Sequence, residues 1–157
     1  MTAAPASASG LALAVGTELP PLRRTYTRER WAWGESAIDA GAGDEDRSFR
    51  PERSIHSDER LAAEQGLPGR IATGALLVNW ISGVLVRHFG LGYIERGALQ
   101  VKFVSPVLEG EVVTVQLRVR SLVPVEGGTR CELDVSLESS SGATCVAGEA
   151  SALVPGS

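Results

Sequence analysis

The sequence contains few of the residues that mark several common classes of protein. It has two histidines, two cysteines, and aromatic residues at only 5% of its 157 positions. Its 19 Asp and Glu outnumber its 15 Lys and Arg, which gives a net charge of −4. This is the wrong sign for a protein that neutralises nucleic-acid phosphates. We therefore expect no nucleic-acid partner, and a core built mainly from Val, Leu, Ile and Ala.

Long apolar runs are also lacking. No stretch approaches the roughly 20 apolar residues that a membrane-spanning helix needs. The opening residues, MTAAPASASGLALAVG, lack the basic segment that begins a secretory signal. We therefore expect a cytoplasmic protein that makes no membrane contact.

Cysteine usage is equally sparse. Cys131 and Cys145 form no CxxC pair, and neither has a histidine near it in the sequence. This spacing favours two buried reduced thiols over a zinc site, a disulfide or a redox pair. We expect neither a metal ion nor a cofactor.

The chain length suits one domain. Residues 1–17 are rich in Ala, Ser, Gly and Thr and predict a disordered tail, so the folded domain should cover residues 18–157. A short extended segment should then run through Tyr26, and Thr27 should cap a helix.

The predicted first helix carries Trp31 and Trp33, which we interpret as packing anchors. Residues 41–54 then mix Gly, acids, Arg and Pro without periodicity and predict an exposed loop. His56 follows this loop. Ser57 should cap a short helix that ends at Gly66.

The next helix is unusually apolar. From Thr73 or Gly74 to Phe89 the chain reads TGALLVNWISGVLVRHF, with apolar residues on almost every face. Such a pattern predicts a helix surrounded by protein. His88, beside Arg87 in the last turn, fits a structural role because a cation there complements the helix dipole.

Beyond Gly90 the apolar residues alternate with polar ones. The segments GALQVKFVSPV, EVVTVQLRVRSLVPV, TRCELDVSLES and TCVAGEASALV are separated by turn signals such as Gly127-Gly128. This period of two predicts four sequential antiparallel strands. The expected fold is α+β, with a curved antiparallel sheet wrapped around a long central helix.

This order of parts resembles the MaoC-like (R)-specific enoyl-thioester hydratases and dehydratases of the hotdog fold. The segments GLPGRIATGALLVNWISGVL and GALQVKFVSPVLEGEVVTVQLRV carry the resemblance, which spans roughly Leu19 to Val154. It implies a single hotdog domain and, as substrate, an acyl thioester of coenzyme A or an acyl carrier protein. It also implies a homodimer or higher homo-oligomer, with a heterodimer as the alternative.

The family's catalytic loop reads approximately DxNPxH, followed by HxD. The corresponding residues here are PERSIH, then Ser57 and Asp58. The resemblance therefore implies that His56 is the acid-base histidine, whereas Pro51 replaces the usual aspartate. Glu52 is the nearest replacement acid, although neighbouring residues in an extended segment point to opposite sides. The acids at 44–46 are further candidates.

The resemblance also implies a substrate-binding set. Backbone amides at Thr73-Gly74-Ala75, where the long helix begins, would polarise the thioester carbonyl. Ser82 matches a serine that the family places near the acid-base pair, but it could equally satisfy its hydroxyl on a backbone carbonyl. Arg53 either holds a substrate carboxylate or phosphate, or is a loop arginine paired with Glu52 or with an acid of the preceding loop.

Three functions remain open from the sequence. The first is hydration or dehydration of an enoyl or 3-hydroxyacyl thioester. The second is a repurposed hotdog enzyme, such as a cyclase or isomerase in polyketide-like biosynthesis, since the catalytic loop is altered. The third is a non-catalytic acyl-binding subunit paired with a complete hydratase chain. A thioesterase is a lesser possibility, because no positioned carboxylate is evident.

Overall fold

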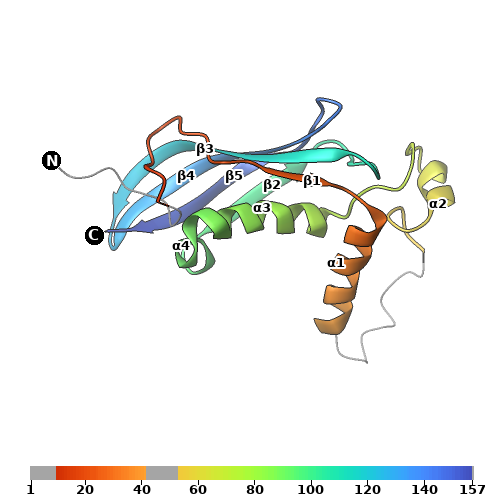
Figure 1. Cartoon of the computed structure of the whole chain (residues 1–157), viewed down its shortest axis with the longest axis horizontal. Coiled ribbons are helices and arrows are strands. Elements are labelled where there is room, and N and C mark those ends of the chain that lie inside the picture. The colour runs from red at the N-terminus through yellow and green to blue at the C-terminus, as the bar shows by residue number, and fades with distance from the viewer. Residues whose placement is uncertain (1–9, 42–52, 157) are drawn as a thin grey trace.

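The computed structural model of the chain describes residues 10–41 and 53–156. Figure 1 shows a curved sheet with one long helix lying along one of its faces. The elements, in chain order, are β1 (Leu22–Thr25), α1 (Arg28–Gly41), α2 (Glu59–Glu64), α3 (Gly74–Phe89), α4 (Leu91–Ile94), β2 (Ala98–Phe103), β3 (Val112–Val125), β4 (Gly128–Ser139) and β5 (Thr144–Pro155).

The sheet has five antiparallel strands in the order β1-β3-β4-β5-β2. The four strands predicted from the alternating pattern are confirmed, but they are not a simple meander. Strand β2 pairs with β5, from Ala98 opposite Ser151 to Phe103 opposite Val146, and so forms an edge of the sheet. Strand β1 forms the other edge beside β3. The α+β class is confirmed. The alternating pattern predicts where strands occur but not which strands pair, so it did not predict this strand order.

One face of α3 packs against the sheet. Leu77, Ile81 and Leu85 are buried there, one turn apart, together with Val84, His88 and Phe89. The opposite face, carrying Ala75, Asn79, Gly83 and Val86, is exposed. We predicted that protein surrounds this helix on all sides. That prediction is wrong for the single chain, because one side of the helix is exposed. The exposed side chains are mostly small, so apolar character alone did not distinguish the two faces.

The inner face of the sheet supplies the other half of the core. Alternate residues of β3, β4 and β5 are buried, and Cys131 and Cys145 are among them as free thiols. Burial raises the pKa of the Cys131 thiol to about 11, so it stays protonated at neutral pH. The prediction of two buried reduced cysteines is confirmed.

The amino-terminal segment packs against β3 well before residue 18. Leu13 is 1% exposed, the Gly16 amide donates to the Val119 carbonyl at 2.8 Å, and the Val119 amide donates to the Thr17 carbonyl at 2.8 Å. The predicted disordered tail therefore does not extend through residues 10–17. The composition of this segment suggested disorder, but Leu13 is buried in the core and Leu11 packs against it. Residues 1–9 lie outside the described part.

Two details of the first helices differ from expectation. Thr27 caps α1 as predicted, since its hydroxyl accepts the Arg30 amide at 3.3 Å, but Trp33 is 80% exposed and only Trp31 packs against the core. Asp58, not Ser57, caps α2. Both residue types are good caps, and a shift of one position is decided by the turn before the helix.

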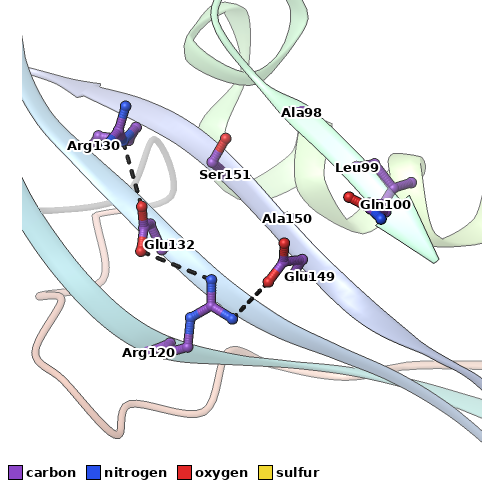
Figure 2. A pocket seen from close by; sticks show the side chains of 9 residues that line it. All are labelled: Ala98, Leu99, Gln100, Arg120, Arg130, Glu132, Glu149, Ala150 and Ser151. Carbon is purple, nitrogen blue, oxygen red and sulfur yellow. Dashed lines mark hydrogen bonds and ion pairs between the residues drawn. The ribbon is translucent and has the colours of Figure 1, made fainter.

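The outer face of the sheet carries a cluster of charges around Arg120 (Figure 2). Its guanidinium lies 2.8 Å from Glu149, 3.6 Å from Asp134 and 3.8 Å from Glu132. The cluster lines a hollow of about 420 Å³ on β2–β5. The charged residues that line it, Arg120, Arg130, Glu132 and Glu149, already partner one another.

Replacing Arg120 by Ala should lower the thermal unfolding temperature. Three carboxylates would lose the cation that they share, and exposed charges are screened by salt. The loss should therefore be largest at low ionic strength and shrink as NaCl is added. Arg118→Ala is the matched control: Arg118 lies on the same face of β3, opposite Asp134, but none of the ion pairs found among the described side chains involves it. Equal losses in both variants would contradict the role of the cluster.

Candidate active site

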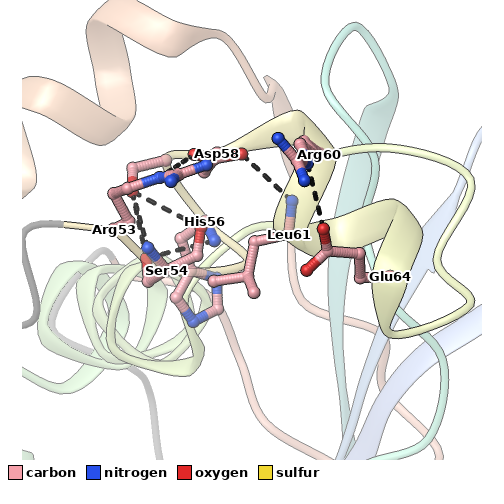
Figure 3. A network of polar contacts seen from close by, with 8 residues as sticks. Arg53, Ser54, His56, Asp58, Arg60, Leu61 and Glu64 are labelled. Carbon is pink, nitrogen blue, oxygen red and sulfur yellow. Dashed lines mark hydrogen bonds and ion pairs between the residues drawn. The ribbon is translucent and has the colours of Figure 1, made fainter.

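His56 lies in the turn before α2 (Figure 3). Its ring is held at one nitrogen. The Nδ1 atom is 2.9 Å from the carbonyl oxygen of Ile71. A carbonyl only accepts hydrogen bonds, so Nδ1 carries the proton in the neutral ring. The lone pair of Nε2 therefore remains available to take a proton.

The Ile71 carbonyl is itself held in place. It also accepts a hydrogen bond from the hydroxyl of Tyr26, at 3.2 Å, and the Ile71 amide donates to the Ile55 carbonyl at 3.3 Å. The next amide, of Ala72, donates to the Val107 carbonyl at 2.9 Å. Sequence reasoning missed Tyr26 and Ile71, because a backbone acceptor leaves no residue-type signal.

The amino end of α3 presents free backbone donors. Thr73 caps the helix, with its hydroxyl accepting the Leu76 amide at 3.3 Å. Among the described residues, no acceptor meets the amides of Gly74 and Ala75. Unpaired amides and the positive end of the helix dipole both favour a partial negative charge at this place.

Gly74 is in contact with the ring of Phe103 at the end of β2. A Cβ atom at position 74 would lie 2.9 Å from Cζ of that ring, so any larger residue would have to displace it. Glycine thus lets the strand end and the helix start approach closely. Glycine has no side chain that would stand beside this helix amide.

His56 and Gly74 line the same pocket, of about 320 Å³. A small pocket with mostly apolar walls and a few polar groups is typical of a site for a small organic ligand. The other lining residues are Leu67, Ile71, Ala72, Leu77, Phe103, Val104, Ser105, Pro106 and Val107.

The structure does not bring the other predicted α3 residues into this pocket. Ala75 is exposed, and Thr73 acts as the cap. Ser82 lies eight residues beyond Gly74, which is about 12 Å along a helix axis. Its hydroxyl lies 3.3 Å from the Tyr93 hydroxyl. The backbone partner that we considered for Ser82 is therefore replaced by a side chain of α4.

Arg53 pairs with Asp58, a partner that the sequence did not predict. The hydrogen bond from Arg53, and then the Leu61 amide, lower the pKa of the Asp58 carboxyl to about 2. Asp58 is thus a firmly ionised cap rather than a free base. Glu52, Pro51 and the acids at 44–46 lie outside the described residues.

Two further features concern ligand classes. Within residues 10–41 and 53–156, no group of three His, Cys, Asp or Glu side chains is arranged to hold a metal ion. None of the helices described there is long and apolar enough to cross a membrane.

The ion pair of Asp58 should make stability depend on pH in acid. A lowered carboxyl pKa contributes stability above the ordinary value of about 3.8, and this contribution is lost as the pH falls through about 2. Asp58→Asn keeps a capping side chain but removes the charge. Wild type should exceed Asp58→Asn in unfolding free energy above pH 4, and the gap should close towards pH 2.

Urea unfolding across this pH range measures the gap. Glu64→Gln is the control, because it removes one negative charge from an exposed pair with Arg60 in the same helix. A gap between wild type and Asp58→Asn that is constant from pH 2 to pH 6 would contradict the assignment.

Known structures share this architecture. R-hydratase PhaJ1 from Pseudomonas aeruginosa is 23% identical with a TM-score of 0.68, over 93% of this chain and 84% of that one. An (R)-hydratase from A. caviae involved in PHA biosynthesis is 25% identical with a TM-score of 0.68, over 92% and 98%. The ChsH1-ChsH2 complex from Mycobacterium tuberculosis is 14% identical with a TM-score of 0.68, over 90% and 98%. No curated protein sequence matches.

A family comparison agrees with the fold. The sequence profile described as "MaoC like domain" matches residues 52–139, which is more than half of the chain. The match includes the turn with His56, the whole of α3, and strands β2 to β4. With its sheet wrapped along a central helix, the protein has the hotdog fold and belongs to the MaoC-like domain family.

Proposed function

We propose that the protein is a hydratase or dehydratase that acts on an enoyl or 3-hydroxyacyl thioester. The observation that supports this proposal is one pocket lined both by His56, whose Nδ1 meets a carbonyl and leaves Nε2 free, and by Gly74, whose amide is unpaired at the start of α3. The family membership, and two structural neighbours whose titles name (R)-hydratases, support the same reaction class.

The reaction needs two kinds of group, and the pocket contains both. In hydration, Nε2 of His56 takes a proton from water as the oxygen attacks Cβ of the enoyl group. The electron pair of the double bond moves towards the thioester oxygen, where the Gly74 amide stabilises the developing charge. A proton then returns to Cα, so that one water is added across the bond. Dehydration follows the same steps in reverse.

The replacement of the usual loop aspartate by Pro51 bears on the acid-base step. Asp58 is a poor substitute, because it is engaged by Arg53 and by the Leu61 amide. Glu52 remains our candidate for the second acid-base residue. Without such a residue, His56 would perform both proton transfers, and a missing acid-base group commonly lowers the rate by about 10² to 10⁴.

The carrier of the acyl group is coenzyme A or an acyl carrier protein in this proposal. Both carriers present the acyl thioester at the end of a long flexible arm, so a pocket open to the surface would serve either. The apolar walls of Leu77, Phe103 and Val107 suit an acyl chain. Arg53 is bonded to Asp58 through Nε, but its side chain is 63% exposed and its remaining N–H donors would meet an anionic group of the substrate.

Substitution of His56 by Ala should lower kcat/KM by about 10² to 10⁴ with enoyl-CoA and 3-hydroxyacyl-CoA substrates. Absorbance of the conjugated thioester measures the rate in both directions. His88→Gln is the matched control, because His88 is buried at the other end of α3, where its Nε2 lies 3.4 Å from the Pro20 carbonyl oxygen. Turnover that persists without His56, or no turnover on any acyl chain or carrier, would contradict the proposal.

A second candidate is a subunit that completes a pair with a different MaoC-like chain. Pro51 in the catalytic loop favours this possibility, and one structural neighbour is titled as a complex of ChsH1 with ChsH2. Exposed apolar residues on α4 and at the end of β2, namely Leu91, Ile94, Phe103 and Val104, would suit an interface in either a homodimer or a heterodimer.

Light scattering and turnover of the purified chain distinguish the two assemblies. A homodimer that is active by itself supports the hydratase proposal. A chain that is inactive alone, but gains activity when it is produced together with a MaoC-like chain that retains the loop aspartate, supports the paired subunit. An active homodimer contradicts the second candidate.

A further inference from the structure

Ser54 is the centre of the turn that carries His56 (Figure 3). Its amide donates to the Ser57 hydroxyl at 3.0 Å. Its carbonyl accepts the amides of Ser57 at 3.0 Å and of Asp58 at 2.8 Å. Its hydroxyl accepts the His56 amide at 3.2 Å. All the polar groups of this one residue are therefore bonded within residues 54–58.

The bond from the His56 amide differs from the others because it holds the histidine directly. The main chain of His56 is anchored on the Ser54 side chain, while its ring is anchored on the Ile71 carbonyl. These two acceptors belong to different segments of the chain. Without the first bond, the peptide between Ile55 and His56 would keep only the bond from the Ile71 amide to the Ile55 carbonyl, at 3.3 Å. The ring would keep its bond to the Ile71 carbonyl, but the main chain that carries it would be held less firmly.

Ser54 stands where the family's loop pattern has a proline. A proline would fix φ at this position through its ring but would supply neither an amide donor nor a hydroxyl. In this chain, hydrogen bonds provide the restraint instead. A serine hydroxyl can also be removed by a single substitution that leaves the main-chain bonds of the turn in place.

We propose that Ser54 is a positioning residue that holds the His56 amide, so that Nδ1 meets the Ile71 carbonyl and Nε2 stays free. Only the catalytic consequence of this role depends on the proposed function. The ends of the turn are tied separately, because Asp58 caps α2 and pairs with Arg53. Loss of the Ser54 hydroxyl should therefore affect the histidine locally and leave α2 in place.

Nitrogen-15 NMR of the imidazole rings tests the position of His56 without any substrate. The chain has two histidines, and His88→Gln leaves His56 as the sole signal. In this background His56 should be the Nδ1–H tautomer at high pH. Ser54→Ala should give a mixture of tautomers, and Ser54→Thr, which retains the hydroxyl, should restore the single form. An unchanged tautomer in Ser54→Ala would overturn the proposal.

Kinetics provide the second readout. Ser54→Ala should lower kcat about tenfold, the effect expected from loss of one hydrogen bond, with KM nearly unchanged and with rescue by Ser54→Thr. Ser57→Ala is the matched control. It removes the hydroxyl that meets the amide, the carbonyl and the hydroxyl of Ser54, but it leaves the bond from the His56 amide to the Ser54 hydroxyl in place. An equal loss in both Ala variants would indicate general loosening and overturn the assignment.

The two readouts separate the two proposals. If the wild-type chain turns over no thioester, the proposed function fails, but the tautomer of His56 still decides the role of Ser54. If turnover depends on His56 while the tautomer is insensitive to Ser54, the hydratase proposal stands and the positioning role is rejected.

Discussion

The burial of one face of α3 against the sheet is the contact on which the rest of the structure depends. Leu77, Ile81 and Leu85 are at most 3% exposed, and each fully buried side chain of this kind contributes about 1.5–3 kcal/mol. This packing fixes the helix relative to the strands. Its amino end therefore meets the end of β2, where Phe103 covers Gly74. The pocket exists because these two ends meet.

The histidine is held in a different way from the helix. No sheet strand carries His56, and its restraints are hydrogen bonds to Ser54 and to the carbonyl of Ile71. The segment that contains Ile71 is joined to the rest of the domain through Ala72, whose amide donates to the Val107 carbonyl. The apolar core thus places one half of the site, and polar contacts between loops place the other. The second half is the more sensitive to small sequence changes.

Features that depend on nearby residues could be predicted from the sequence. The helix start capped by Thr73 and the alternating strands follow from local patterns. The position of β2 at a sheet edge, the exposed side of α3 and the pairing of Arg53 with Asp58 could not, because each depends on contacts made only in the folded chain. The hydrogen bond between His56 and Ile71 could not be predicted either, because its acceptor is a backbone carbonyl, which every residue has. Glu52 stays a prediction.

Ile71 contributes to the pocket in two ways, through its backbone carbonyl and as a residue of the lining. Its carbonyl orients His56, while the residue itself also forms part of the pocket lining. A substitution changes the side chain but leaves a carbonyl in the same place, provided that the backbone path is kept. Substitution at this position can therefore reshape this wall of the pocket without removing the acceptor that orients His56. The shape of the pocket and the tautomer of His56 thus depend on different groups of the same residue.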